Sequence, residues 1–207
     1  MSTFYTIFLN INYILLFINS VLGFGKFGYF AKKEKMYIFY IFFLFLIEMT
    51  VFVLTTGYEF KDLSFMYPIY IAGEFFLLTS LFIGKLNVNR LFIALPALLA
   101  TAFWIVVFGL KIKFNHDIAK VISNIIIICL AAIFLIMQIK KVKKVERFVL
   151  VDAGIFFYYS VSILIFVIQS QLKNLSLESV YLITGINCFF AAVLYSLITY
   201  TFVKLKK

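Results

Sequence analysis

Long runs of apolar residues alternate with short polar segments along the whole chain, and this pattern predicts its helices. About 20 consecutive apolar residues span the hydrocarbon core of a bilayer as an α-helix. Runs of this length without a period of two favour helices over a transmembrane barrel. We therefore predict seven membrane-spanning helices, at about 4–24, 36–57, 65–84, 91–110, 118–139, 148–171 and 179–203.

The segments between these runs are short and polar, and none is long enough to form a domain of its own. No internal repeat is evident, so we predict that residues 1–207 form one transmembrane bundle. Pro68 suits the first turn of the third helix, where a backbone N–H would lack a partner in any case. Pro96 lies inside the fourth helix and would bend it, which a membrane bundle tolerates.

Composition supports the same fold class. Hydrophobic residues make up 65% of the chain and charged residues 14%, whereas soluble domains carry roughly 25% charged residues. The predicted fold is therefore all-α: a polytopic transmembrane bundle of seven helices.

Lysine and arginine residues gather in every second connecting segment, and such residues mark the cytoplasmic side of short loops. Fourteen of the 19, including Lys85, fall on the side of the C-terminus. The other five are Lys61, Lys111, Lys113, Lys120 and Lys173. We predict an outside N-terminus and a cytoplasmic C-terminus, in a multi-pass protein of the inner (plasma) membrane. The first run has no basic flank before it, so it is not expected to be a cleaved signal peptide.

The densest basic segment is 140-KKVKKVER-147, which contains Lys140, Lys141, Lys143, Lys144 and Arg147. One interpretation is that these residues hold the loop in the cytoplasm and rest on anionic lipid headgroups. The other is that they dock an acidic cytoplasmic partner. Nucleic acid is a weaker candidate for that partner, because no stacking platform or recognisable motif accompanies the bases.

Three acids lie inside predicted helices. Glu48 and Glu74 fall about halfway along the second and third runs, and so near the same depth, while Asp152 lies near the cytoplasmic end of the sixth. A central acid costs roughly 2.5–3.5 kcal/mol on insertion, which the surrounding Leu, Ile, Phe and Val offset. Insertion alone therefore does not show why the acids are present.

Helical spacing places Tyr67, Tyr70 and Glu74 on one face, and polar faces of this kind turn away from lipid. Our hypothesis is a shared polar cavity near the midplane, in which Glu48 and Glu74 are close enough to share a proton. It would take a cationic or amphipathic ligand, or relay protons. Its candidate residues are Glu48, Glu74, Tyr67, Tyr70, Tyr158 and Asn187.

The alternative is that these groups only join helices through hydrogen bonds, with each Glu protonated as one more donor. For Asp152 the corresponding alternative is an ion pair with Lys143 or Lys144.

Motifs for catalysis or metal binding are absent from the sequence. Cys129 and Cys188 lie inside predicted helices and behave there as small apolar residues. The single histidine, His116, is expected in an outer loop beside Asp117. We expect no cofactor, no metal and no enzymatic activity.

Three segments of the chain carry a resemblance to known proteins: 66-MYPIYIAGEFFLLTSLF-82, 147-RFVLVDAGIFFYYSVSILIFVI-168 and 182-LITGINCFFAAVLYSLITYTFVK-204. They resemble a group of small, Phe-rich, seven-helix bacterial inner-membrane proteins, some of which are encoded beside signalling kinases. In size and layout the chain is also similar to the small membrane accessory protein of RNA-targeting CRISPR systems. These resemblances imply a regulatory role for a compact membrane bundle.

The leading hypothesis is a regulatory or ligand-responsive membrane protein that acts on a cytoplasmic partner through its basic face. One alternative is a small transporter or channel that uses Glu48 and Glu74. Another is a CRISPR-associated accessory protein that modulates an RNA-guided nuclease. An intramembrane lipid-modifying enzyme would need a reacting group that the sequence does not offer.

Overall fold

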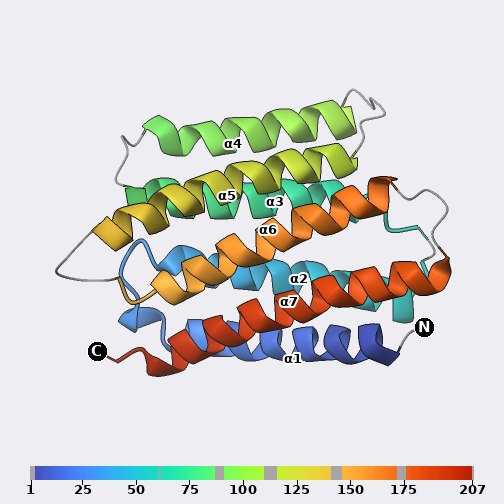
Figure 1. The fold of residues 1–207 in the computed structure, drawn as a ribbon, viewed down its shortest axis with the longest axis horizontal. Coiled ribbons are helices and arrows are strands. Elements are labelled where there is room, and N and C mark those ends of the chain that lie inside the picture. The colour runs from blue at the N-terminus through green and yellow to red at the C-terminus, as the bar shows by residue number, and fades with distance from the viewer. Residues whose placement is uncertain are drawn as a thin grey trace.

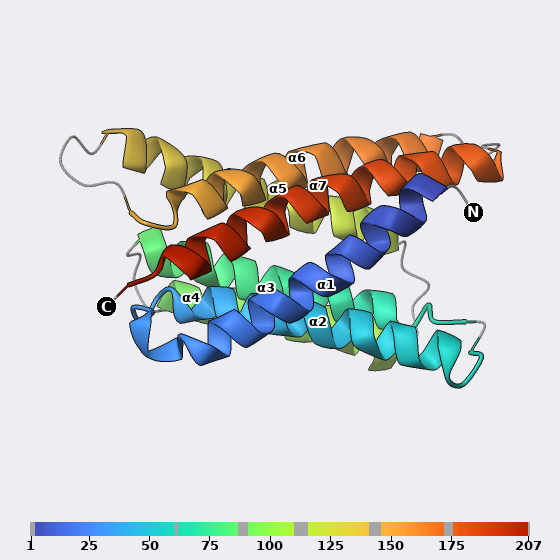
Figure 2. The same ribbon diagram turned by 90° about the horizontal axis from the view of Figure 1, so that it is seen from below.

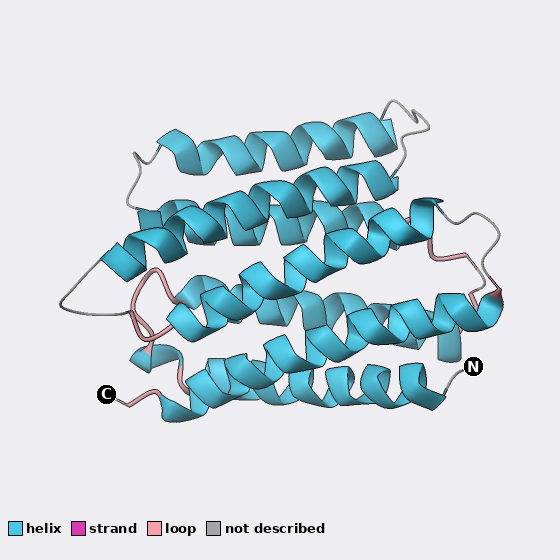
Figure 3. Cartoon of the chain, viewed as in Figure 1, coloured by secondary structure: helices cyan, strands magenta, loops and turns pink. Residues whose placement is uncertain are grey.

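The computed structural model describes residues 3–60, 62–86, 91–109, 116–140, 146–171 and 176–206, and in these ranges it contains only helices and loops (Figure 3). The α-helices are α1 (Thr3–Gly25), α2 (Lys35–Thr56), α3 (Met66–Leu86), α4 (Leu91–Trp104), α5 (His116–Lys140), α6 (Val149–Gln171) and α7 (Leu177–Lys204). A 3-10 turn, Phe27–Tyr29, follows α1, and a π-helical segment, Ile105–Gly109, continues α4. Each predicted run corresponds to one of these helical segments, and the ends agree to within about two residues.

Six of the helices, all except α4, are long and apolar enough to cross a membrane, which marks a multi-pass membrane protein. The shorter apolar helix is Ala94–Gly109. Large apolar side chains point outward, and Leu98 and Leu164 are more than 60% exposed. Asn19 and Asn124, in contrast, are fully buried. Polar side chains of the helices thus lie in the interior at these two positions, whereas Asn10 and Thr55 are exposed.

Six helices form a closed ring in the order α1, α2, α3, α5, α6, α7, with each one packed on the next and α7 packed on α1. In Figure 2, α5, α6 and α7 form one layer over α2 and α3, and α1 crosses between the layers at one edge. Helix α4 packs on α3 outside the ring and lies at the margin of the bundle (Figure 1). The interior that could hold a site is thus enclosed by the other six helices.

Helices α1 and α7 run in the same direction, side by side (Figures 1 and 2). Two side chains of α1, and that of Lys26 directly after it, donate hydrogen bonds to carbonyl oxygens of α7 at a seven-residue spacing: Asn12 to Cys188 (3.0 Å), Asn19 to Tyr195 (2.9 Å) and Lys26 to Phe202 (3.0 Å). Seven residues are two helical turns, so the three contacts lie on one face of each helix.

The Lys26 amine also donates to the carbonyl oxygens of Val203 (2.7 Å) and Leu205 (3.2 Å). These carbonyls lie at the end of α7, where the helix itself offers no partner. Lys26, directly after the end of α1, therefore caps the last turn of α7.

The prolines and one glycine show how α3 and α4 are built. Pro68 is the third residue of α3, as predicted for the first turn, and α4 runs through Pro96 before it widens into the π-helical segment. A Cβ atom on Gly73 would lie 2.2 Å from the Phe43 ring of α2. A larger residue at position 73 would therefore require the Phe43 ring to move.

We predict that Asn19→Ala lowers the free energy of unfolding by about 1 kcal/mol, because Asn19 bonds both the Tyr195 carbonyl and the Thr199 hydroxyl (2.9 Å each). The control is Asn10→Ala, the same truncation at an exposed position of α1. Denaturant unfolding in mixed micelles measures both. Equal losses in the two variants would show that the α1–α7 hydrogen bonds contribute nothing.

Candidate functional site

Glu74 lies inside the bundle, 1% exposed, in an ion pair with Lys120 of α5. Tyr70 and Tyr159 donate their hydroxyl protons to the Glu74 Oε1 atom, at 2.8 and 2.6 Å. Lys120, 2% exposed, also donates to the Tyr70 hydroxyl at 3.2 Å. The carboxylate therefore has three donors, which is the arrangement that a charge buried away from water needs.

Aromatic rings surround the Lys120 amine. Its Nζ atom lies 4.3 Å from the centre of the Tyr70 ring and 5.6 Å from that of Tyr159, within the range of cation–π attraction. The Tyr40 hydroxyl of α2 lies 3.0 Å from that of Tyr159. The Glu74 network thus joins α2, α3, α5 and α6.

A second buried ion pair lies nearer the end of the bundle that carries the C-terminus. Lys85 of α3 donates to Asp152 of α6 at 2.5 Å and to the Tyr37 hydroxyl of α2 at 2.5 Å. Tyr37 in turn donates to the other oxygen of Asp152, and Glu146 lies 3.8 Å from the Lys85 amine. Asp152 and Tyr37 are fully buried.

These observations correct three predictions. Lys120 was counted among the bases of the outer side, yet it is buried in the second turn of α5, and Lys85 was assigned to an inner loop, yet it is buried in the last turn of α3. Asp152 pairs with Lys85, whereas the predicted partners Lys143 and Lys144 lie outside the described residues. His116 is not in a loop, because α5 begins there. Each lysine stands at the end of an apolar run, where it can extend toward water or turn inward.

Glu48 has different surroundings from Glu74. It lines a cavity of about 210 Å³ among α1, α2, α3, α6 and α7. The other lining residues are Leu9, Asn12, Tyr13, Leu16, Leu44, Tyr70, Tyr158, Phe166, Asn187, Cys188, Ala191 and Tyr195. Among the described residues, no ion pair or hydrogen bond reaches the Glu48 carboxylate.

The groups beside Glu48 are electron-rich. Four tyrosines line the cavity, and the side-chain oxygens of Asn12 and Asn187 have no hydrogen-bond partner in the described part of the chain. The Asn12 amide nitrogen is already used by the Cys188 carbonyl. A carboxylate, two amide oxygens and tyrosine rings are the groups that bind an organic cation. Across the described ranges, no group of three His, Cys, Asp or Glu residues could hold a metal ion.

The structure brings together four of the six predicted cavity residues: Glu48, Tyr70, Tyr158 and Asn187. Glu74 is not among the lining residues, because its carboxylate is bonded to Lys120, Tyr70 and Tyr159 instead. A cavity in which Glu48 and Glu74 share a proton is therefore not what the structure shows.

Tyr67 does lie on the predicted face, with its ring stacked on Tyr70 at 6.5 Å, but it too is absent from the cavity lining. Its hydroxyl lies 3.5 Å from Asp117. Tyr70 is the residue common to both regions, since it lines the Glu48 cavity and donates to Glu74.

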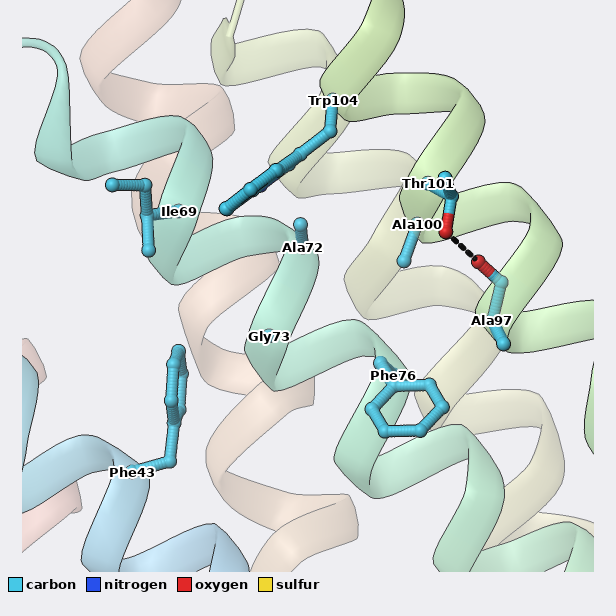
Figure 4. Close-up of a pocket in the computed structure, with 9 residues that line it drawn as sticks. All are labelled: Phe43, Ile69, Ala72, Gly73, Phe76, Ala97, Ala100, Thr101 and Trp104. Atoms are coloured by element: carbon cyan, nitrogen blue, oxygen red, sulfur yellow. Dashed lines mark hydrogen bonds between the residues drawn. The ribbon is translucent and has the colours of Figure 1, made fainter.

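A larger cavity of about 330 Å³ lies between α3 and α4, and Figure 4 shows its lining. Its residues are Phe43, Ile69, Ala72, Gly73, Phe76, Ala97, Ala100, Thr101 and Trp104. The Thr101 hydroxyl, one of its few polar groups, donates to the Ala97 carbonyl of its own helix at 2.7 Å. This lining offers hydrocarbon contact and no charge, so the Glu48 cavity is the better candidate for a specific site.

The predicted basic segment is only partly described, since Lys141, Lys143 and Lys144 lie outside the described residues. Lys140 is exposed at the end of α5. Arg147 makes a two-point ion pair with Glu34 (2.8 and 2.5 Å) and donates to the Tyr29 carbonyl at 3.0 Å. Burial acts to raise the pKa of the Glu34 carboxyl, but the hydrogen bonds from Arg147 and from the Ala31 N–H outweigh it and hold this pKa below its ordinary value.

Sequence reasoning missed Lys85, Lys120 and Tyr37 as members of polar networks. For Lys120, its place three residues into the predicted fifth run was a usable signal. For Lys85 no such signal exists, since it directly follows the predicted third run.

Comparisons with protein-family models, with curated proteins and with solved structures found no match to this chain. The two resemblances stated above therefore stay predictions.

We predict that Lys120→Met lowers the free energy of unfolding by about 3 kcal/mol or more, because it leaves the Glu74 charge buried without its cation. In the double variant Glu74→Gln with Lys120→Met, the loss should be smaller than the sum of the two single losses. Denaturant unfolding in mixed micelles measures the cycle.

The matched control for this cycle is Lys140→Met, which removes an exposed lysine from the other end of α5 and should change stability by less than about 0.5 kcal/mol. Strictly additive losses for Glu74 and Lys120 would contradict a stabilising ion pair.

Proposed function

We propose that this protein is a ligand-responsive integral membrane protein that binds a small organic cation in the Glu48 cavity. The observation that carries the proposal is the Glu48 carboxylate, which faces a cavity without a cation of its own in the described part of the chain. An ammonium group there would meet the carboxylate, tyrosine rings and amide oxygens at once.

We propose further that the chain crosses the membrane seven times. Helices α3 and α5 run in the same direction, since Glu74 and Phe82 of α3 meet Lys120 and Phe134 of α5 in that order. The intervening chain has to return along the bundle, and residues 91–109 are the helical segment available. At the α-helical rise they extend roughly 28 Å, close to the hydrocarbon thickness.

The proposed orientation has the N-terminus outside and the C-terminus in the cytoplasm. Its support is the charge at one end of the bundle, where α1 and α7 finish and α2 and α6 begin (Figure 1). The described bases there, besides the buried Lys85, are Lys26, Lys32, Lys33, Lys35, Lys140, Arg147, Lys204 and Lys206. Bases on short loops favour the cytoplasmic side.

Tyr70 provides a physical connection between the cavity and the rest of the bundle. A ligand that displaces the Tyr70 ring would also disturb its hydrogen bond to Glu74, and with it the contact of α3 with α5. Tyr158 lines the cavity, and its neighbour Tyr159, whose ring centre lies 5.0 Å away, donates to Glu74. Binding at Glu48 would in this way alter the packing of α3, α5 and α6 and be read by a cytoplasmic partner at the basic end.

A transporter is the second candidate, because the cavity lies inside the ring of helices and is bounded by five of them. That position is typical of substrate sites near the bilayer midplane.

We predict that choline raises the Tm of the purified protein, and that 3,3-dimethylbutan-1-ol, its uncharged analogue, does not. At a choline concentration of ten times Kd, binding adds about 1.4 kcal/mol to the free energy of unfolding. This corresponds to a rise in Tm of roughly 3 °C or more. Glu48→Gln should abolish the shift, because the neutral amide leaves the ammonium unpaired.

The control is Glu59→Gln, the same change at an exposed loop position. An equal shift with the uncharged analogue, or a full shift in Glu48→Gln, would show that the site does not bind cations through Glu48. Uptake of labelled choline by proteoliposomes then separates the two functions: Glu48-dependent accumulation supports the transporter and contradicts the purely responsive protein.

The partner is tested separately. Changing Lys140, Lys141, Lys143 and Lys144 together to Gln should release cytoplasmic proteins that co-purify with the membrane-inserted chain, since four cations are lost from one face. The matched control changes Lys61, Lys111, Lys113 and Lys173 to Gln. The sequence assigns these four lysines to the opposite side of the membrane. Recovery of the same proteins after the first change would contradict a role for the basic segment.

A further inference from the structure

A groove of about 370 Å³ lies at the basic end of the bundle, between the start of α6 and the end of α7. Its lining residues are Arg147, Leu150, Tyr200, Thr201, Lys204, Leu205 and Lys206. Three of these carry a positive charge, two carry a hydroxyl group, and none is acidic. The groove is separate from the Glu48 cavity and shares no residue with it.

The charges of the groove are only partly neutralised. Arg147 is paired with Glu34, whereas no ion pair reaches Lys204 or Lys206 within the described residues. The Lys204 amine donates to the Tyr200 hydroxyl and lies 4.3 Å from the centre of its ring. The Tyr200 oxygen thus acts as the acceptor in this bond, and its own proton is left to donate to an anion.

The position of the groove identifies the kind of anion. Lys204 is the last residue of a membrane-spanning helix, and Leu150 is the second residue of another. Leu150, Tyr200 and Val203 are about half exposed, so apolar surface borders the charged groups. Phosphate bound by lysine and tyrosine at the helix ends, with hydrocarbon contact directly beside it, matches a phospholipid at the level of its headgroup.

We propose that this groove is a binding site for the phosphate headgroup of an anionic phospholipid, held by Lys204, Lys206 and the Tyr200 hydroxyl, with an acyl chain against Leu150. The lipid would contact both α6 and α7 where the two helices end at the basic side. This site does not depend on the proposed cation ligand.

The test uses the full chain in detergent, with phosphatidylglycerol or phosphatidylcholine added and the lipid retained measured by native mass spectrometry. Wild-type protein should retain phosphatidylglycerol in preference. The double variant K204Q/K206Q should lose at least about tenfold in affinity for it, since each lysine near a membrane surface contributes several-fold. The matched control K32Q/K140Q removes two exposed lysines from the same end and should change the affinity by less than about twofold.

Further measurements separate loss of the site from loss of folding and from binding of a soluble anion. K204R/K206R preserves the charge and should retain the lipid, and thermal unfolding without lipid shows whether each variant is folded. Inorganic phosphate in excess should not displace phosphatidylglycerol, because it lacks the acyl chain.

Three outcomes would overturn the proposal. An equal loss of phosphatidylglycerol affinity in K32Q/K140Q would mean diffuse electrostatic attraction, and undiminished affinity in K204Q/K206Q would remove the two lysines from the site. Displacement of phosphatidylglycerol by inorganic phosphate would assign the groove to a soluble anion.

Discussion

The arrangement of the bundle depends on two charged side chains of α3 that are buried against neighbouring helices. Glu74 and Lys85 are eleven residues apart, close to three full helical turns, so they share one face of the helix. Glu74 meets a lysine of α5, and Lys85 meets an aspartate of α6. A rotation or shift of α3 would separate both pairs, and an unpaired charge in this interior costs several kcal/mol. The two pairs therefore determine the orientation of α3 against both neighbours.

Tyrosine hydroxyl groups supply the buried charges with hydrogen bonds that water would supply at a protein surface. In each buried ion pair, one tyrosine hydroxyl donates a hydrogen bond to the acid and accepts one from the lysine amine. These tyrosines are Tyr70 beside Glu74 and Tyr37 beside Asp152. Tyr37 is in addition stacked on Phe148, with ring centres 4.6 Å apart. A tyrosine fills apolar space with its ring while its hydroxyl satisfies a polar partner, so it suits a site that excludes water. This explains why the polar networks are built on a Phe- and Tyr-rich chain.

Hydrophobic run length predicted the helices well, because a bilayer permits few alternatives to a helix about 20 residues long. Helical period also placed Tyr70 and Glu74 on one face correctly. Neither signal determines how a helix is rotated against helices that are not its neighbours in sequence. Glu48 and Glu74 were expected to face one another because their depths agree, but depth says nothing of rotation, and Glu74 turns to α5. The inward direction of Lys85 depends on those same neighbours, and for this reason it could not be predicted, whereas the place of Lys120 inside the predicted fifth run was a usable signal.

The difference between the two mid-helix acids carries the functional argument further. Glu74 shows what this bundle supplies to a carboxylate at that depth: an ammonium group from Lys120, held against the rings of Tyr70 and Tyr159. Glu48 lies beside tyrosines as well, Tyr70 among them, yet the lining of its cavity contains no lysine or arginine. Lys120 is in this sense an internal example of the kind of ligand that we propose for the cavity. The chemistry that satisfies Glu74 from within the chain is the chemistry that an organic ammonium ion would bring to Glu48 from outside.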